Sequence, residues 1–154
     1  MSLPLAGVTV VDFSRILSGP YATMILADLG AAVIKVERPG RGDGARALPP
    51  LKDGKSAYFA TLNRGKRSIA LDFEDETDRA LLDRILARAD VVVENFRPGV
   101  LARHGLDWET LHTRFPALIH ASVSGYGQTG PDAKRPSYDA VAQALSGVSS
   151  LFID

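Results

Sequence analysis

Short runs of β-branched and apolar residues recur along this chain, and segments with helical periodicity separate them. Five such runs are typical of strands: residues 8–13, 32–37, 68–72, 90–94 and 118–123. The strands read as apolar runs rather than as alternating patterns, which indicates burial on both faces of a parallel sheet. The pattern therefore predicts an α/β fold, with a parallel sheet and helices on both of its faces.

Helices are expected between these runs, over residues 21–28, 75–88, 107–114 and 138–145. Pro20 suits the first position of the first helix, where its missing N–H costs nothing. Asp107 suits the cap of the third helix, and Ser137 and Asp139 both suit the start of the fourth. Residues 38–55 are rich in glycine and proline and predict a long loop, a feature that is often functional in a compact domain.

Composition narrows the class of protein. The chain has 154 residues with 18 basic and 18 acidic side chains, so its net charge of zero gives no support to a general nucleic-acid binder. It contains no cysteine, which excludes disulfides and thiolate chemistry and fits a cytoplasmic protein. We see no signal peptide and no apolar run near the roughly 20 residues that cross a membrane. No nucleic-acid or membrane partner is expected.

In parallel α/β sheets ligands bind at the carboxyl ends of the strands, so residues that follow a strand are candidates. Leu17 and Ser18 follow the first strand at a helix N-terminus, which favours an anion; a plain strand–helix turn is the alternative. Arg38 follows the second strand and could grip a phosphate or stack on a purine, or could be a solvated loop residue. Asn95 and Phe96 follow the fourth strand, where a tight turn is also expected.

Other positions are weaker candidates for ligand binding. Glu37 stands where dinucleotide folds hold a ribose, but the glycine fingerprint of those folds is missing. Residues 63–67 carry three cations and are expected to form a solvated edge, and residues 125–131 could approach a ligand or serve as a plain connector. No catalytic triad, paired carboxylate or metal-ligand spacing is present. The residues alone predict an α/β domain that binds an anionic, phosphate-bearing ligand.

A series of motifs then resembles the opening of the family III CoA-transferases, which include formyl-CoA transferase, carnitine CoA-transferase and α-methylacyl-CoA racemase. The motifs are PLAGVTVVDF (4–13), GP (19–20), LGA (29–31), VIKVER (33–38), NRGKRSI (63–69), ADVVVENFRPG (89–99), SGYGQTGP (124–131) and YDAVAQALSG (138–147). Each is weak alone, but together and in this order they cover essentially the whole chain.

The resemblance implies a Rossmann-like, coenzyme-A-binding domain over residues 1–147, with 148–154 starting a segment that leads to the rest of a longer protein. Coenzyme A would lie across the strand ends. The contacts carried over from the family are Leu17, Ser18, Arg38, Leu71, Asp72, Phe73, Glu74, Asn95, Phe96, Arg97, Arg103, Arg135 and Tyr138. The resemblance implies no metal.

The implied reaction moves coenzyme A from an acyl-CoA to a small carboxylic acid. The family's catalytic aspartate, which forms an acyl anhydride and then a CoA thioester, would lie downstream of residues 138–147 and beyond this chain. We therefore assign no catalytic residue and expect the chain alone to be inactive. The resemblance also implies an interlocked homodimer, of which this chain is the N-terminal part.

Three alternatives remain open at this point. Racemases of the family tend to carry a histidine where this chain has Tyr138, and a phenol is a poor base at neutral pH, which argues against racemase chemistry. A nicotinamide-dependent oxidoreductase would need the missing glycine fingerprint. A non-catalytic, coenzyme-A-binding fragment or half of a split enzyme is the third reading.

Overall fold

The computed structural model describes residues 2–152 and contains a five-stranded parallel sheet at its centre. The strands lie in the order β5-β2-β1-β6-β7, so the first strand is the central one. Their bounds are Thr9–Asp12 (β1), Ala32–Glu37 (β2), Arg67–Ala70 (β5), Val91–Glu94 (β6) and Ile119–Ser122 (β7). The α/β fold with a parallel sheet is confirmed, and every predicted strand is present with slightly shifted ends.

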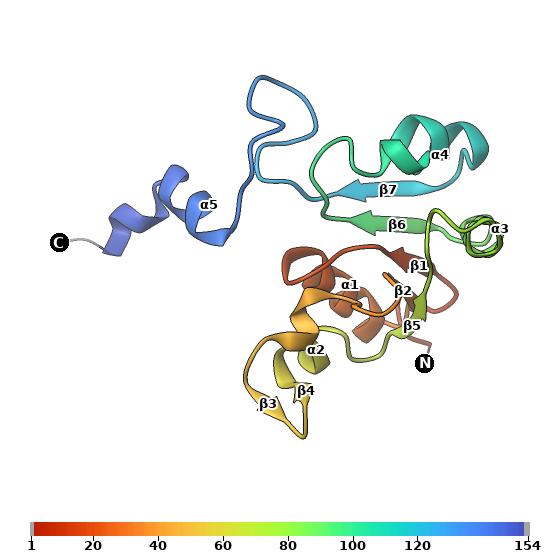
Figure 1. The fold of residues 1–154 in the computed structure, drawn as a ribbon, viewed down its shortest axis with the longest axis horizontal. Helices are drawn as coiled ribbons and strands as arrows, with labels where there is room; N and C mark the ends of the chain where they lie inside the picture. Colours follow the sequence, from red (N-terminus) through yellow and green to blue (C-terminus); the bar gives the residue numbers. More distant parts are fainter. Residues whose placement is uncertain (1, 153–154) are drawn as a thin grey trace.

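Helices and short turns connect the strands (Figure 1). The helices are α1 (Ser18–Asp28), α2 (Ala57–Leu62), α3 (Glu76–Leu86), α4 (Trp108–Arg114) and α5 (Asp139–Leu145). Three 3-10 turns are present, η1 (Gly44–Ala47), η2 (Ala102–His104) and η3 (Val148–Phe152), and a small antiparallel hairpin joins β3 (Leu51–Lys52) to β4 (Lys55–Ser56). None of the helices in residues 2–152 is long and apolar enough to span a membrane.

Two apolar clusters hold the sheet between its helices. The larger cluster joins strand residues such as Val11 and Val92 to Leu82 of α3 and Leu111 of α4, all of them inaccessible to solvent. The smaller cluster lies on the other face, where Val10 and its neighbours meet α1. Each fully buried aliphatic side chain contributes about 1.5–3 kcal/mol through the hydrophobic effect. Val10 and Val11 of β1 thus face opposite clusters, which explains why two apolar residues follow one another in this strand.

The first residues and caps of the helices agree with the sequence predictions at some positions and differ at others. Asp107 caps α4 as predicted, because its carboxylate accepts the Thr110 N–H. Helix α1 begins at Ser18, so Pro20 is its third residue rather than its first, and that prediction is wrong. The predicted cap by Asp139 is also wrong: Tyr138 holds the cap position without a side-chain bond. Asp139 instead accepts a hydrogen bond from the Gln143 amide, one turn further along the helix.

The long loop predicted over residues 38–55 contains more structure than expected. It includes η1, which Asp43 caps by accepting the Ala45 N–H, and the β3–β4 hairpin. Helix α2 follows at once and was not predicted; Ser56 caps it by accepting the Phe59 N–H. These elements have two to six residues, too few to show a hydrophobic period in the sequence.

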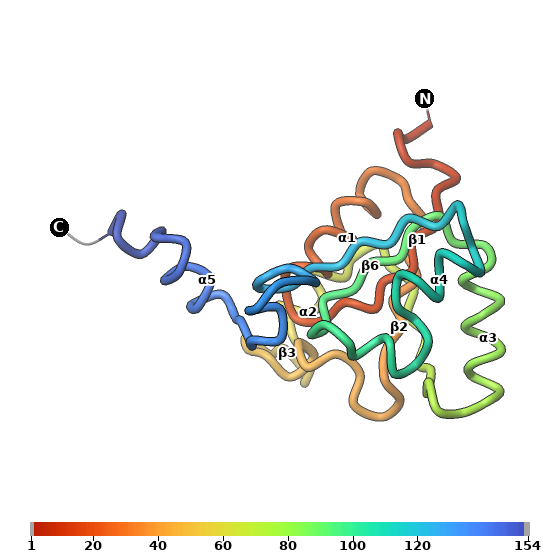
Figure 2. The backbone as a smooth tube through the Cα atoms, turned by 90° about the horizontal axis from the view of Figure 1, so that it is seen from above, coloured from red at the N-terminus to blue at the C-terminus, as the bar shows by residue number. Residues whose placement is uncertain are grey.

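The C-terminal part of the structure stands apart from the sheet (Figure 2). After β7 the chain makes an extended excursion, and α5 and η3 lie beyond the end of the layered body. Neither α5 nor η3 contains a buried residue. These two elements therefore contribute nothing to the core of the layered body.

Candidate functional site

The order of the strands identifies one preferred place for a ligand. From β1 the chain passes to β2 and β5 on one side of the sheet, and later to β6 and β7 on the other. The loops that follow β1 and β6 therefore leave in opposite directions and open a crevice at the carboxyl end of the sheet. In this fold class ligands bind at such a switch point. We call this end the carboxyl edge.

The turn after β1 is anchored through its backbone. The Asp12 carboxylate accepts both the N–H and the hydroxyl of Ser14. The Asn95 side chain, which follows β6, accepts the Arg15 N–H at 2.8 Å and donates to the Arg15 carbonyl at 2.7 Å. Asn95 is one of the predicted ligand contacts, and in this structure its amide joins the loops of the two strands at the switch point.

Two ion pairs are buried beneath this turn. Lys66 Nζ lies 3.0 Å from Asp12 Oδ2, and Lys35 Nζ lies 3.0 Å from Asp43 Oδ2, with all four side chains at most 1% exposed. Burial lowers the pKa of the Lys66 ammonium, and the Asp12 carboxylate opposes that shift. The prediction of a solvated edge at residues 63–67 is thus wrong for Lys66. It does describe Arg64, whose pair with Asp28 is half exposed.

Glu37 serves the fold rather than a ribose. Its buried carboxylate accepts two hydrogen bonds of 2.7 Å from the Arg46 guanidinium and one of 2.6 Å from the Ser68 hydroxyl. Burial by itself raises the pKa of Glu37, but these hydrogen bonds outweigh burial and lower it to about 2. The guanidinium in turn lies 3.9 Å from the centre of the Phe59 ring. The carboxylate is therefore fully engaged inside the protein.

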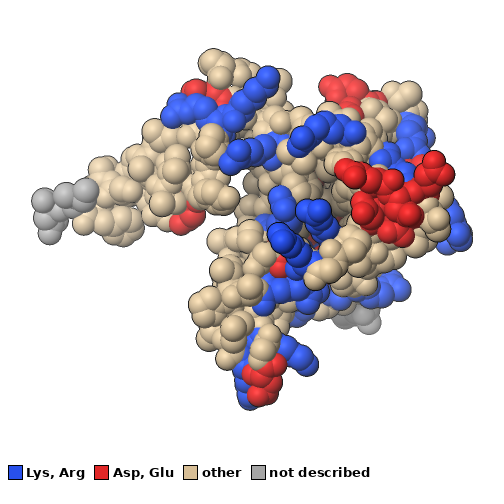
Figure 3. Space-filling view, viewed as in Figure 1, with Lys and Arg blue, Asp and Glu red and all other residues tan. Residues whose placement is uncertain are grey.

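A cavity of about 530 Å³ opens at the carboxyl edge above these pairs. Six of the predicted contacts line it: Arg38, Leu71, Asp72, Phe73, Glu74 and Phe96. Arg15 and Arg41 line it as well, and the Arg15 guanidinium lies 4.6 Å from the centre of the Phe96 ring. Among residues 2–152, neither Arg38 nor Arg41 forms an ion pair. Figure 3 shows Lys and Arg side chains gathered around a hollow near the middle of the face drawn.

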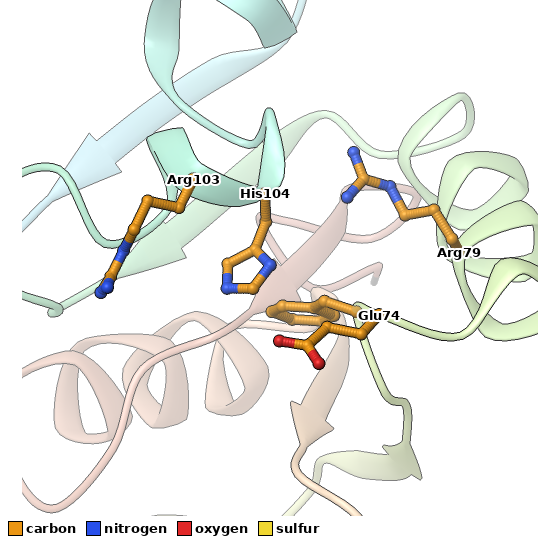
Figure 4. Close-up of a pocket in the computed structure, with 5 residues that line it drawn as sticks. Glu74, Arg79, Arg103 and His104 are labelled. Carbon is orange, nitrogen blue, oxygen red and sulfur yellow. The ribbon is translucent and has the colours of Figure 1, made fainter.

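A second cavity of about 490 Å³ adjoins the first and shares Phe73, Glu74 and His104 with it. Its remaining lining residues are Arg79 and Arg103, which lie on opposite sides of His104 (Figure 4). The Phe73 ring packs edge-on against the imidazole, with ring centres 5.5 Å apart. The two cavities thus share one lining, which combines aromatic rings with arginine side chains and the carboxylates of Asp72 and Glu74.

The other predicted contacts do not line these cavities. Leu17 and Ser18 are exposed at the start of α1, beside Asn95, and Arg97 is exposed in the loop after β6. Arg135 pairs with Asp132 in the C-terminal segment, and Tyr138 is 74% exposed there. The structure therefore gathers the contacts from the strand ends and leaves the pair from residues 135–138 apart from them.

Several residues that line this site were not predicted from the sequence. Arg41 and His104 line the depression, and the paired side chains of Lys35 and Asp43 also form part of its lining. One signal was available: Lys35 is the only charged residue within the apolar run AVIKV, and a lysine in a buried strand needs a charged or polar partner. The partner, eight residues later in a loop, could not be read from the sequence pattern. Within residues 2–152 no three His, Asp or Glu side chains come together as a metal site.

The sequence is similar to a known protein family and to several of its named members. The model of the family described as CoA-transferase family III matches residues 5–153. Acetyl-CoA:oxalate CoA-transferase from Acetobacter aceti is 50% identical over 145 residues, which are 94% of this chain and 37% of that protein. Human succinyl-CoA:glutarate CoA-transferase is 48% identical over 146 residues, 94% of this chain and 33% of that protein.

Solved structures agree with these sequence relatives. A CAIB/BAIF family protein from Brucella suis superposes with a TM-score of 0.90 at 47% identity, covering 96% of this chain and 40% of that one. Rv3272 from Mycobacterium tuberculosis superposes with a TM-score of 0.87 at 41% identity, covering 97% and 42%. The chain thus spans about two fifths or less of the length of these relatives. The motif resemblance is confirmed, and the chain belongs to CoA-transferase family III.

Proposed function

We propose that the protein carrying this chain transfers coenzyme A from an acyl-CoA to a small carboxylic acid, and that this chain supplies the coenzyme A site. The observation that carries the proposal is the cationic and aromatic depression at the carboxyl edge, where Arg15, Arg38 and Arg41 surround an open cavity. Coenzyme A presents phosphates and an adenine ring. A guanidinium suits both, because it binds phosphate through two hydrogen bonds and stacks on flat rings.

The proposed roles of the individual residues follow from the chemistry of their side chains. Arg38 is proposed to hold a phosphate or the adenine, while Phe73 and Phe96 offer apolar faces to the rest of the ligand. Arg103, in the adjoining cavity, offers a second cationic contact. Leu17, Ser18, Asn95 and Arg97 are proposed to contact the ligand from the switch-point loops, and Leu71, Asp72 and Glu74 from the end of β5. Arg135 and Tyr138 remain proposed contacts from the C-terminal segment.

The nucleophile is proposed to lie outside this chain. The transfer needs a carboxylate that attacks the thioester carbonyl, releases the coenzyme A thiolate and leaves an acyl anhydride on the enzyme. The buried carboxylates beside the cavity are engaged: Asp12 and Asp43 pair with lysines, and Glu37 with Arg46. We therefore expect no turnover from the 154-residue chain alone. Relatives named as transferases, and Tyr138 in place of a histidine, favour transferase over racemase chemistry.

The assembly and location of the whole protein are also proposals. The family resemblance supports an interlocked homodimer, with residues 1–147 as its coenzyme-A-binding domain. A cytoplasmic location is supported by the absence of cysteine from this sequence. Acyl-CoA and a small carboxylic acid are the proposed partners, with acetyl-CoA or succinyl-CoA and a dicarboxylic acid suggested by the names of the relatives.

Calorimetry with coenzyme A on the whole protein tests the site. Arg38→Ala is expected to weaken binding by about 1.5–3 kcal/mol, because it removes hydrogen bonds between charged groups. Arg38→Lys is expected to recover only part of the loss, since an ammonium neither stacks nor binds bidentately. Arg88→Ala, an exposed arginine just before β6 at the opposite end of the sheet, is the control. Equal affinity in all variants would reject the assignment.

A further inference from the structure

The turn after β1 adopts a backbone conformation that its sequence does not favour. Ile16 has φ = 69°, in the left-handed region. A β-branched residue is rarely found there, because its Cβ crowds the backbone. The strain of such a residue persists only where the surroundings hold it. Some interaction outside the turn must therefore fix Ile16.

The Lys35–Asp43 pair provides that interaction. The Asp43 carboxylate accepts the Ile16 N–H at 3.1 Å, and the same carboxylate caps η1 through the Ala45 N–H at 2.9 Å. Lys35 Nζ lies 3.0 Å from this carboxylate and donates to the Ser14 carbonyl at 2.7 Å. One ammonium thus bonds the turn directly at Ser14 and, through Asp43, at Ile16. We call this arrangement the clasp: Lys35 and Asp43 bound across the turn of residues 14–16.

Stability alone does not account for a clasp of this kind. Both side chains are almost fully buried, so each charge loses its hydration. Replacing a buried ion pair with uncharged residues of similar volume is often neutral or stabilising. What the pair supplies here is a fixed geometry, because it determines the path of a strained turn. That turn forms a wall of the larger cavity, through Ser14 and Arg15.

We propose that Lys35 and Asp43 are positioning residues that hold Ile16 in its left-handed conformation and so preform the coenzyme A cavity. They act through the turn and need no contact with the ligand. This inference rests on the proposed function, because it takes coenzyme A as the ligand of the cavity. It extends that function by locating the source of the site's rigidity on β2 and in the loop before η1, in two residues that also line the cavity.

The test compares two backgrounds of the whole protein. The double variant Lys35→Met/Asp43→Ala removes both charges, both contacts of Lys35 and the carboxylate that accepts the Ile16 N–H. We expect its Kd for coenzyme A, measured by calorimetry, to rise about tenfold with a melting temperature close to that of the parent. In the Ile16→Gly background the same double change is expected to raise Kd by less than about threefold, because glycine adopts positive φ without strain.

The coupling between the two changes separates positioning from simple loss of structure. A purely structural role would change Kd by the same factor in both backgrounds, and that result would overturn the inference. Should the double variant fail to fold with Ile16, Asp43→Ala alone replaces it, and the same coupling with Ile16→Gly decides. Lys52→Met/Asp53→Asn, on the exposed β3–β4 hairpin, is the matched control and is expected to leave Kd unchanged.

Different measurements would reject the coenzyme A site and the role of the clasp. A parent protein that does not bind coenzyme A would reject the proposed function itself. A parent that binds, with a double variant that binds equally well, would reject only the clasp. The affinity of the parent is therefore measured first, and the variants are interpreted against it.

Discussion

The layered body and the C-terminal segment use similar residues to different effect. In the body, Leu82, Leu106 and Leu111 are fully buried between helices and the sheet. In the C-terminal segment, Leu145 of α5 is 61% exposed and Phe152 of η3 is 82% exposed. Both regions contain helices that the sequence pattern predicts in part. The apolar residues become a core only where strands from distant parts of the chain come together.

This contrast shows that a local signal can specify a helix without specifying what the helix packs against. Helix α5 has seven residues and no buried side chain. A helix this short is marginal without packing. Helix α3, with eleven residues, buries Leu82 and Leu86 and has an aspartate cap. We therefore expect substitutions in the body to change the free energy of unfolding and equivalent ones in the segment to change it little.

Removing one partner of a buried ion pair should have the largest effect. Lys66→Met leaves the Asp12 carboxylate buried without its counter-charge, and we expect a loss of about 3–5 kcal/mol in unfolding free energy. Arg64→Met, which breaks the half-exposed pair with Asp28, is expected to cost less than about 1 kcal/mol. Urea denaturation measures both. Similar losses would show that burial does not distinguish the two pairs.

A leucine pair compares the two regions directly. Leu111→Ala opens a cavity beneath α4 and is expected to cost about 2–5 kcal/mol. Leu145→Ala, on the exposed face of α5, is expected to change stability by less than about 0.5 kcal/mol. Thermal unfolding of the two variants in parallel would reveal the difference. A large loss at Leu145 would mean that α5 is packed in solution.

The Glu37 carboxylate should make stability depend on pH. Its pKa of about 2 in the folded state lies below the ordinary value of 4.5. The folded state therefore gains stability above pH 4.5 and loses it as pH falls from 4.5 towards 2, by about 3 kcal/mol in total. Glu37→Gln should flatten this part of the profile in urea titrations at pH 5 and pH 3. Asp132→Asn, which removes an exposed carboxylate from the C-terminal segment, should leave the profile unchanged.

The caps offer the smallest comparison. Asp75 accepts the N–H groups of Thr77 and Asp78 at the start of α3, so Asp75→Ala should cost about 1 kcal/mol. Tyr138 caps α5 without any side-chain bond, so Tyr138→Ala should cost less. Circular dichroism during thermal unfolding would detect the first change. Equal costs would indicate that Tyr138 makes stabilising contacts in solution.

The sequence predicted the sheet better than the site, for a physical reason. A run such as VVVE at 91–94 carries its own strand signal, because β-branched residues favour a buried strand wherever they pack. The pairing of Lys66 with Asp12 joins positions 54 residues apart, and no local pattern encodes it. The same limit explains why the prediction of a solvated edge was wrong for Lys66. Arg38 and Phe96, both predicted from their places after strands, line the same cavity because the ends of parallel strands share one edge of the sheet.

The anchoring of the turn after β1 has a consequence for how the chain folds. The Asn95 side chain accepts a hydrogen bond from Arg15, 80 residues earlier in the chain, and Asp43 accepts one from Ile16, 27 residues earlier. Contacts between residues far apart in the chain require large loops to close first, and they slow folding. The turn is therefore expected to take its final shape only after β2 and β6 have joined β1. It cannot be transplanted as a short motif of its own, because the residues that fix its shape lie elsewhere in the chain.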